Sequence, residues 1–173
     1  MKPSLTVKAL LWTALLTVAM LSPSWAGEFT VAFADPAWDG KKIPDGQHCS
    51  KFGGQGATPA LRVSGIPAGT AMIVVEFNDL DYGPLSSGGG HGVIGFAHDG
   101  GTEATLPSVA GETSDMPEGV TLVRKNRARG AFNAPGYLPP CSGGRRNKYR
   151  AVVKALDANE DELAETEITL GRY

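Results

Sequence analysis

Short runs of β-prone residues, separated by glycine and proline, constrain the fold of this chain more than any other feature. The 173 residues include 23 glycines and 12 prolines, which are spread along the chain instead of forming one linker. Glycine and proline favour turns and interrupt helices, so the runs between them are typical of short strands. After residue 26, no long stretch shows the periodicity of an amphipathic helix. The sequence therefore predicts a mainly β protein.

These runs predict how the chain is organised. We expect an antiparallel β-sandwich, or a partly open barrel, with long loops that carry the functional site. A single short helix is predicted near residues 159–165, where acidic side chains suit the first turn of a helix. The predicted strands are residues 29–33, 61–63, 71–77, 92–96, 120–124, 148–156 and 166–170.

The first 26 residues resemble a secretory signal peptide. A positive start precedes an apolar run over residues 9–21, and Ser24-Trp25-Ala26 places small residues at the two positions that a signal peptidase recognises. A retained membrane anchor is the alternative, but it needs roughly 20 apolar residues. We therefore expect cleavage after Ala26, which leaves residues 27–173 as a single domain that is periplasmic or secreted.

Cys49 and Cys141 are the only two cysteines of the chain. An even pair in an exported protein is most simply a disulfide, because disulfides persist in oxidising compartments. Two free thiols or a metal site are the alternatives. A disulfide would join an early loop to a late one and stabilise the fold by restricting the unfolded chain.

Basic residues are concentrated in one segment of an otherwise acidic chain. The formal net charge is −2 at pH 7, yet residues 124–150 contain eight basic residues and no acidic one. Such a segment attracts an anionic membrane surface or an acidic protein partner when its side chains share one face. The alternative is that these side chains are scattered over both ends of strands. Nucleic acid is not expected as a partner, because the chain is acidic overall and is expected to be exported.

An apolar run that ends in two carboxylates points to a functional site. Residues 71–77 lead to Asp79 and Asp81, and a two-residue step along a strand places both carboxylates on one side. The following residues 82–90 are rich in glycine and serine, which favours a turn. His91 begins the next apolar run. The two runs are therefore predicted to be neighbouring strands, with His91 close to the aspartates.

Less specific interpretations of these residues exist. An Asp-x-Asp pair before a turn often caps that turn through side-chain hydrogen bonds, and a histidine that opens a strand is often structural. Hydrolase chemistry would need an aspartate and His91 to activate Ser86, Ser87 or a metal-bound water. The chain has no Gly-x-Ser-x-Gly motif and no second histidine at zinc spacing. We therefore expect no catalytic residue, no metal site and no cofactor.

Several motifs follow one another along the chain. In order, they are Thr58-Pro59-Ala60-Leu61, Gly65-Ile66-Pro67-Ala68-Gly69-Thr70, Asp79-Leu80-Asp81, Gly90-His91, Gly136-Tyr137 leading to Cys141, and Asn147-Lys148-Tyr149. In this order and spacing they resemble the phosphatidylethanolamine-binding protein (PEBP) or Raf kinase inhibitor-like family. The resemblance is to its bacterial YbhB/YbcL-like branch, whose exported members have a cysteine pair at corresponding places.

The resemblance implies a central antiparallel sheet packed on a second sheet, with a small pocket at one edge. In the family this pocket takes anions such as phosphate or a phosphoethanolamine head group. The glycine loop that ends at Gly90 is expected to offer backbone amides to the phosphate, and Lys148 to add a charge. The residues that carry over to the pocket by position are Asp79, Asp81, His91 and Tyr149.

The chain also departs from the family pattern. Leu80 stands where proline is usual, Asn147 stands where histidine is usual, and glycines replace the tryptophans that commonly flank the histidine. Tyr82 is a candidate for the missing aromatic wall. A carboxylate near His91 should raise the pKa of the imidazole, so that its cation meets the phosphate.

Two functions follow from this pattern. The first is an exported, non-enzymatic binding protein with a pocket for a small anionic or phosphate-bearing ligand. The alternative is a protein-interaction module that inhibits a secreted or envelope protease, or another partner, and has a vestigial pocket. A pocket filled by Tyr82 or Leu85 would favour the second function.

Overall fold

The computed structural model describes residues 27–173, and the predicted signal peptide lies outside these described residues. They form two antiparallel sheets, one of three strands and one of five. Within this part of the chain the only helical elements are three single-turn 3-10 segments. The predicted mainly β sandwich is therefore confirmed. Residues 27–173 contain no helix that is long and apolar enough to cross a membrane.

The smaller sheet has the strand order β1-β2-β5. Its members are β1 (Thr30–Phe33), β2 (Leu61–Ser64) and β5 (Glu103–Leu106). On β2 the side chains of Leu61 and Val63 are buried and that of Arg62 is exposed, which is the alternation of a sheet with one covered face. The sequence prediction missed β5, because this run is short and lies among glycines and polar residues.

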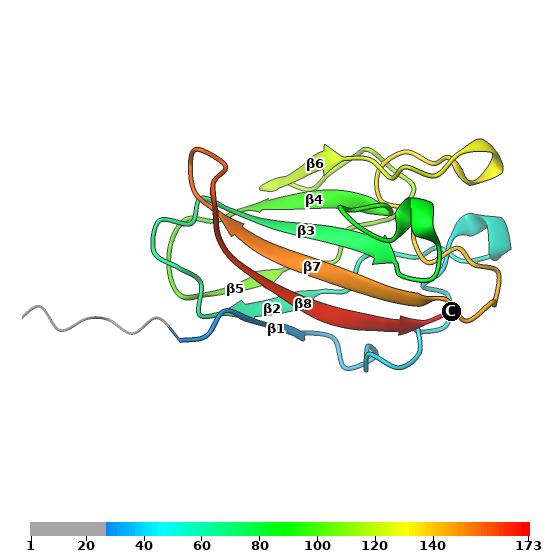
Figure 1. Cartoon of the computed structure of the whole chain (residues 1–173), viewed down its shortest axis with the longest axis horizontal. Helices are drawn as coiled ribbons and strands as arrows, with labels where there is room; N and C mark the ends of the chain where they lie inside the picture. The colour runs from blue at the N-terminus through cyan, green and yellow to red at the C-terminus, as the bar shows by residue number, and fades with distance from the viewer. Residues whose placement is uncertain (1–26) are drawn as a thin grey trace, which may run out of the picture.

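The larger sheet has the strand order β6-β4-β3-β7-β8 and carries the site at one end (Figure 1). Its central strand β3 pairs with β4 on one side and with β7 on the other, and six of its eight residues are buried. A strand in this position has neighbours on both edges, so its ends are fixed relative to the rest of the sheet. The members are β3 (Met72–Asp79), β4 (Gly92–Ala97), β6 (Val120–Arg124), β7 (Lys148–Leu156) and β8 (Glu162–Arg172).

The main hydrophobic core lies between the two sheets. Val63 of β2, Val75 of β3 and Val153 of β7 are fully buried within it. Burial of such side chains removes apolar surface from water and is the main stabilising contribution in a sandwich of this kind. A smaller cluster holds Leu138 next to the two cysteines.

The helix predicted near residues 159–165 is wrong. Residues 157–161 form a turn in which Oδ1 of Asp157 accepts hydrogen bonds from the backbone N–H groups of Asn159 and Asp161 at 2.8 and 2.9 Å. Glu160 has a positive φ of 68°, which a helix does not allow. β8 begins directly after the turn and pairs along the whole of β7. Pairing with β7 therefore outweighs the local preference for a helix.

Loops and 3-10 turns gather at one end of the sandwich, which we call the loop end. It carries the turns η1 (Ser50–Phe52), η2 (Gly83–Leu85) and η3 (Gly130–Phe132), the segment 142–147 and the C-terminal Tyr173 (Figure 1). The turn between β7 and β8 lies at the opposite end. The ends of β3 and β8 and the starts of β4 and β7 therefore point into one cluster of loops.

The predicted disulfide between Cys49 and Cys141 is present, with the two Cα atoms 5.3 Å apart. It joins the residue before η1 to the loop that leads into β7. Disulfides are typical of proteins outside the reducing cytosol. The bond also fixes one side of the loop end, where the cavity described next is found.

Candidate functional site

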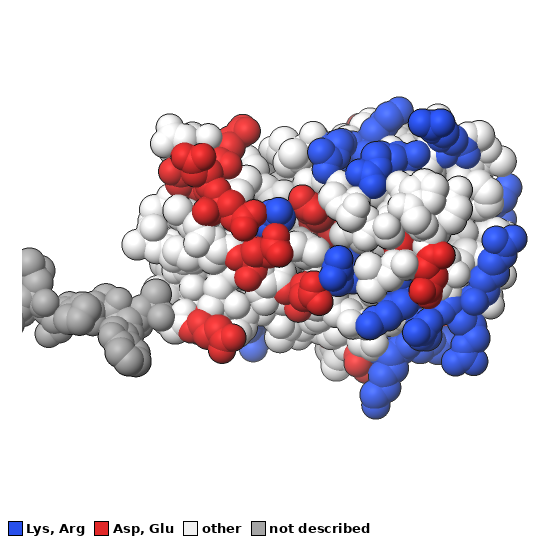
Figure 2. All heavy atoms as spheres, viewed as in Figure 1, with Lys and Arg blue, Asp and Glu red and all other residues white. Residues whose placement is uncertain are grey.

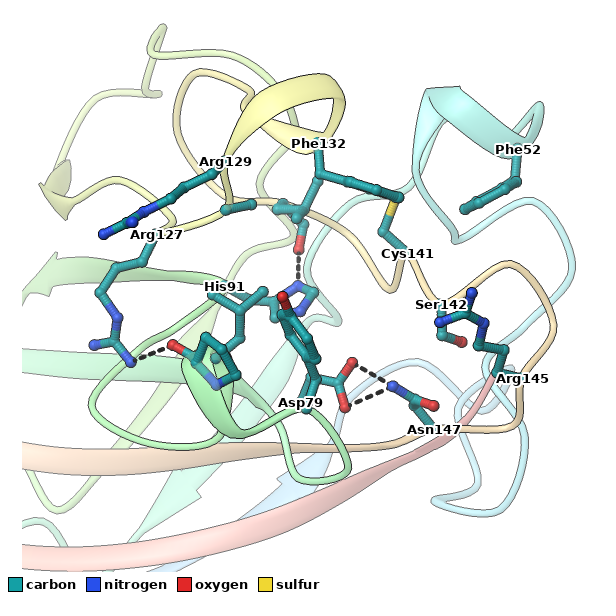
Figure 3. A pocket seen from close by; sticks show the side chains of 15 residues that line it. Phe52, Asp79, His91, Arg127, Arg129, Phe132, Cys141, Ser142, Arg145 and Asn147 are labelled. Atoms are coloured by element: carbon teal, nitrogen blue, oxygen red, sulfur yellow. Dashed lines mark hydrogen bonds between the residues drawn. The ribbon is translucent and has the colours of Figure 1, made fainter.

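A cavity of about 660 Å³ opens at the loop end (Figure 3). Its walls come from loops that are far apart in the sequence, so only the folded chain assembles it. The polar lining residues are Asp79, His91, Arg127, Arg129, Ser142, Arg145 and Asn147, and the others are Phe52, Tyr82, Pro84, Leu85, Ala128, Phe132, Leu138 and Cys141.

β3 and β4 bring Asp79 and His91 to this cavity, as the sequence predicted. Asp79 is the last residue of β3, and His91 immediately precedes β4. The two strands pair through Phe77 and Gly92, and the backbone N–H of His91 donates to the Phe77 carbonyl at 2.8 Å. The turn chemistry of residues 82–90 therefore does bring the imidazole back beside the strand end.

His91 is held as a neutral imidazole. Its side chain is 2% exposed, and Nδ1 lies 2.7 Å from the Leu138 carbonyl, which can only accept, so Nδ1 carries the proton. Burial lowers the pKa of His91, against the opposing effects of this hydrogen bond and of the Asp79 charge. The predicted rise in the pKa is therefore wrong, because desolvation outweighs the carboxylate. Nε2 has no hydrogen-bond partner within residues 27–173.

Asp79 is buried and held by its neighbours instead of contacting the imidazole directly. The Asn147 side-chain amide donates to its two oxygens at 3.0 and 2.8 Å, and the backbone N–H of Asp81 donates to Oδ1 at 3.0 Å. Hydrogen bonds of this kind compensate a buried carboxylate for the water that it loses on folding. Asn147, which departs from the family triplet, is therefore the partner of Asp79 in this chain.

Asp81 and Lys148 are not among the residues that line the cavity. One carboxylate oxygen of Asp81 accepts from the backbone N–H of Lys148 at 2.8 Å and lies 3.4 Å from Nη1 of Arg172. The expectation that Asp79 and Asp81 share one face is wrong, because β3 ends at Asp79 and the alternation of a strand does not continue into the turn. Asp81 caps the start of β7 instead.

Tyr149 lies behind the site and supports it. It is 2% exposed, its ring meets the His91 ring edge-on at 5.4 Å between centroids, and its hydroxyl accepts from the backbone N–H of Cys141 at 3.2 Å. Burial, together with the Asp79 charge, raises the pKa of the hydroxyl. Tyr149 therefore positions His91 and Cys141 and is not part of the cavity lining.

The glycine loop does not offer its amides to a ligand as predicted. The backbone N–H groups of Gly89 and Gly90 donate to Oδ1 of Asn78 at 2.9 and 3.2 Å. A Cβ on Gly90 would lie 2.3 Å from backbone atoms of Leu85, so glycine is required there for close packing. Gly90 is therefore a structural residue. Asn78, which organises this loop, was missed by the sequence analysis.

Three arginines of the basic segment supply the positive charge of the cavity. Arg127 donates to the carbonyls of Pro84, Ser87 and Gly88 and so holds the loop after β3. Figure 3 draws one of these hydrogen bonds. Within residues 27–173, Arg129 and Arg145 form no ion pair. The sequence singled out the basic segment but not these residues, because loop positions follow no periodic pattern.

Aromatic side chains stand around the mouth of the cavity. Phe52 of η1 and Phe132 of η3 have ring centroids 6.4 Å apart, and Tyr82 lies in the loop after β3. Tyr82 and Leu85 line the wall without filling the cavity. The disulfide places η1 here, so an early segment of the chain completes a site that is otherwise built from later ones.

The surroundings of His91 do not form the relay of a serine hydrolase. Its Nδ1–H donates to a carbonyl and not to Asp79. Ser86 Oγ donates to the Gly83 carbonyl, and Ser142 Oγ donates to the backbone oxygen of the C-terminal Tyr173 at 2.6 Å. In residues 27–173, no group of three or more histidine, cysteine, aspartate or glutamate side chains is placed to hold a metal ion.

Comparisons with known proteins agree with this fold. A solved structure described as Escherichia coli YbcL, a new member of the mammalian PEBP family, superposes with a TM-score of 0.54 at 24% sequence identity. The match covers 84% of this chain and 98% of the other. No curated protein sequence matches the chain. The family model described as phosphatidylethanolamine-binding protein matches residues 34–171. The chain therefore belongs to the phosphatidylethanolamine-binding protein family.

Proposed function

We propose that the cavity binds a small ligand with an anionic group, either phosphate or a phosphate-bearing head group. We further propose that the protein is an exported binding protein and not an enzyme. One observation carries the proposal: three positively charged arginines line a cavity whose lining also includes the buried His91, and Nε2 of His91 has no hydrogen-bond partner within the described residues. The description of the matching family names a phospholipid and supports the same ligand class.

The polar groups of the cavity indicate which hydrogen-bond donors and acceptors the ligand must carry. The guanidinium groups of Arg129 and Arg145 donate hydrogen bonds and match the oxygens of a phosphate or carboxylate. Nε2 of the neutral His91 accepts a hydrogen bond. A singly protonated phosphate satisfies both requirements, because it carries anionic oxygens and one hydroxyl.

The carboxylate of Asp79 makes a zwitterionic head group a suitable ligand. Its carboxylate lines the cavity and provides the negative charge there, while the arginines provide the positive charge. An ammonium group of the ligand is attracted to Asp79 and the phosphate to the arginines. Phosphoethanolamine carries both groups and is the ligand that this arrangement favours over inorganic phosphate.

A non-enzymatic role is supported by how two candidate nucleophiles, Ser86 and Ser142, are engaged. The hydroxyls of Ser86 and Ser142 donate to backbone oxygens, and neither hydroxyl is hydrogen-bonded to His91. General-base catalysis requires the base within hydrogen-bond reach of the proton that it removes. The cavity therefore fits binding better than hydrolysis.

Isothermal titration calorimetry with inorganic phosphate and with phosphoethanolamine tests the binding. We expect both to bind, and the double variant Arg129→Gln/Arg145→Gln to bind at least about tenfold more weakly, since charge-assisted hydrogen bonds are lost. His91→Asn keeps a side-chain donor for Leu138 but removes Nε2, and should weaken binding similarly. Arg62→Gln, on the exposed face of β2, is the control. Absence of binding, or equal affinities in all variants, contradicts the proposal.

The non-enzymatic part has its own test. Incubation with 4-nitrophenyl phosphate and with 4-nitrophenyl acetate should release no nitrophenol above the rate without protein. Turnover that the wild type shows and His91→Asn loses would show that the site is catalytic.

A further inference from the structure

We propose that the loop end docks on the surface of an anionic lipid bilayer, with the mouth of the cavity facing the membrane. This inference goes beyond the ligand proposed above, because it rests on exposed side chains around the cavity and not on the groups at its floor. Three observations carry it: the segregation of charge, the unpaired cations and the exposed aromatic rings.

Charged side chains are segregated between the two ends of the molecule (Figure 2). Lysine and arginine gather at the loop end, and most of the acidic residues visible in this view lie toward the other end. A second hollow of about 380 Å³ lies at the loop end, and Gly144 and Arg146 of the segment 142–147 line it, while Arg145 lines the main cavity. The basic residues that line the two hollows are Arg127, Arg129, Arg145, Lys41, Lys42, Arg146 and Arg172.

Several of these cations are not neutralised within the protein. Within residues 27–173, Lys41, Arg129, Arg145 and Arg146 form no ion pair. Arg127 donates only to neutral backbone carbonyls, so its charge is not compensated by them. Unpaired cations in several adjacent loops produce a positive potential that extends into solvent.

Several acidic residues of the loop end are engaged within the protein. Asp79 accepts from the Asn147 amide, and Asp39 accepts from the backbone N–H groups of Lys41 and Lys42. Asp45 pairs with Lys42 at 2.6 Å, and Asp81 pairs with Arg172 at 3.4 Å. Glu112 accepts hydrogen bonds from the backbone and hydroxyl of Ser50. These carboxylates offset part of the positive charge, but none of them forms an ion pair with Arg127, Arg129 or Arg145.

The opposite end carries the reverse charge. Residues 157–162 follow β7 and include four carboxylates, and Glu162 and Glu165 surround the single Lys154 at 3.0 and 3.1 Å. β8 has 11 residues and spans roughly 33 Å between the two ends. A molecule with this charge axis turns its loop end toward an anionic surface and its acidic end away from it.

Exposed aromatic rings stand beside the cations. Phe52 is 41% exposed, Phe132 40% and Tyr82 53%. The ammonium group of Lys51 lies 4.8 Å from the centroid of the Phe132 ring, so apolar and positive groups occupy the same spot. Aromatic side chains with lysine and arginine around them are typical of proteins that insert into the head-group region of a bilayer.

A bilayer fits this surface better than a protein partner does. The cations extend over both hollows and over loops that are far apart in the sequence, whereas the aromatic rings lie at the cavity mouth. A planar anionic surface contacts all of these loops at once. A peptide in the cavity would leave the cations of the second hollow, such as Lys41 and Arg146, without a counter-charge.

Vesicle co-sedimentation tests the docking. We expect the purified protein to bind vesicles of phosphatidylcholine and phosphatidylglycerol at low salt, and to bind poorly at about 0.5 M salt, where the Debye length is only a few ångströms. Pure phosphatidylcholine vesicles should bind far less protein. If the apolar residues 9–21 were retained and caused the binding, the protein would bind both kinds of vesicle equally. The comparison of the two lipid compositions therefore distinguishes this case from docking by charge.

Matched variants locate the contact surface. Arg129→Gln/Arg145→Gln should reduce the vesicle partition coefficient by about fivefold per arginine, and Phe52→Ala/Phe132→Ala should reduce it further at high salt, where charge contributes less. Arg62→Gln on β2 is the control for charge. Leu163→Ala is the control for apolar surface, because Leu163 is 40% exposed at the far end of β8.

A fluorescence readout reports the orientation. Trp38 is buried and is the only native tryptophan after residue 26, so an added tryptophan dominates any change on binding. Emission of Phe132→Trp should shift to shorter wavelength when anionic vesicles are added, and emission of Leu163→Trp should not. A shift at position 163, equal losses in the control variants, or no binding to anionic vesicles at low salt overturns the proposal.

Three further outcomes also overturn it. Sedimentation of the protein without vesicles at low salt would show that the basic end binds the acidic end of another copy. Equal binding of an acidic polypeptide such as polyglutamate, lost in Phe52→Ala/Phe132→Ala, would show that the aromatic and basic surface recognises a protein. If the protein binds phosphoethanolamine but does not bind vesicles, the docking proposal is refuted and the proposed ligand is still supported.

Discussion

The side-chain amide of Asn147 holds the buried carboxylate of Asp79, with Nδ2 3.0 and 2.8 Å from its two oxygens. The two residues are 68 positions apart and come from the loop before β7 and the end of β3. Asp79 is 4% exposed, so this contact replaces much of the water that the carboxylate loses on folding.

Removal of this amide should destabilise the fold. Asn147→Ala leaves Asp79 with fewer donors, and we expect the free energy of unfolding to fall by about 1–3 kcal/mol. Urea denaturation followed by circular dichroism measures the change. Asn159→Ala removes an exposed amide that lies 3.4 Å from Asp157, and should change stability by less than about 0.5 kcal/mol. An equal decrease in the free energy of unfolding in the two variants would show that the contact with Asp79 stabilises the fold no more than an exposed amide does.

The stability of the protein should depend on the protonation of His91. Burial lowers the pKa of the folded imidazole, whereas the unfolded residue titrates near its ordinary value of about 6.5. Below that pH the unfolded state binds a proton that the folded state does not, so the stabilisation is present above about pH 6.5 and is lost as pH falls below it.

The His91→Asn variant isolates this contribution. Between pH 7 and pH 5, the wild type should lose more free energy of unfolding than the variant, by at most about 1.4 kcal/mol per pH unit. Urea denaturation at several pH values provides the two slopes. Parallel slopes would mean that His91 does not titrate differently in the folded state.

The disulfide should contribute much of the stability. Cys49 and Cys141 are separated by 92 residues, and the chain-entropy argument allows about 4–5 kcal/mol for a loop of this length. Cys49→Ser/Cys141→Ser, or reduction of the wild type, should lower the free energy of unfolding accordingly. The same change should weaken phosphoethanolamine binding, since η1 and Phe52 would no longer be fixed at the cavity. An unchanged melting temperature under reducing conditions would contradict this.

Gly90 should tolerate no side chain. A Cβ there would lie 2.3 Å from the Leu85 backbone, which cannot move without shifting η2. We expect Gly90→Ala to cost about 1–3 kcal/mol of stability, because the loop must be displaced. Gly83 lies in the same loop and has open space around its Cβ position, so Gly83→Ala is the matched control. Equal melting temperatures of the two variants would show that the loop adapts freely.

Much of the sheet architecture could be predicted from the sequence. The runs at residues 120–124 and 148–156 coincide with β6 and β7, and the acid-to-histidine connection does join neighbouring strands. β5 and the full length of β8 were not predicted, because their exposed positions carry polar residues and their pairing depends on partners far away in the sequence. Residues 1–26 lie outside the described residues, so the signal peptide stays a prediction.

The site was predicted only in part. Asp79 and His91 line the cavity, whereas Asp81, Gly90, Lys148 and Tyr149 cap, pack or support the elements around it. Sequence motifs identify residues that recur together, but they do not distinguish a lining residue from its support. The arginines and phenylalanines of the cavity were missed because they lie on irregular loops, where no periodicity indicates direction.

By itself, the sequence determined the mainly β class, the apolar strand that leads to Asp79, the return of the chain at His91 and the pairing of its only two cysteines. These features follow from local composition, from alternation along a strand and from the absence of other cysteine partners. The tertiary structure alone decided which loops meet at the cavity and how deeply His91 is buried. Burial and hydrogen-bond partners depend on contacts between distant segments, and here they reverse the direction of the His91 pKa shift that the neighbouring carboxylate had predicted.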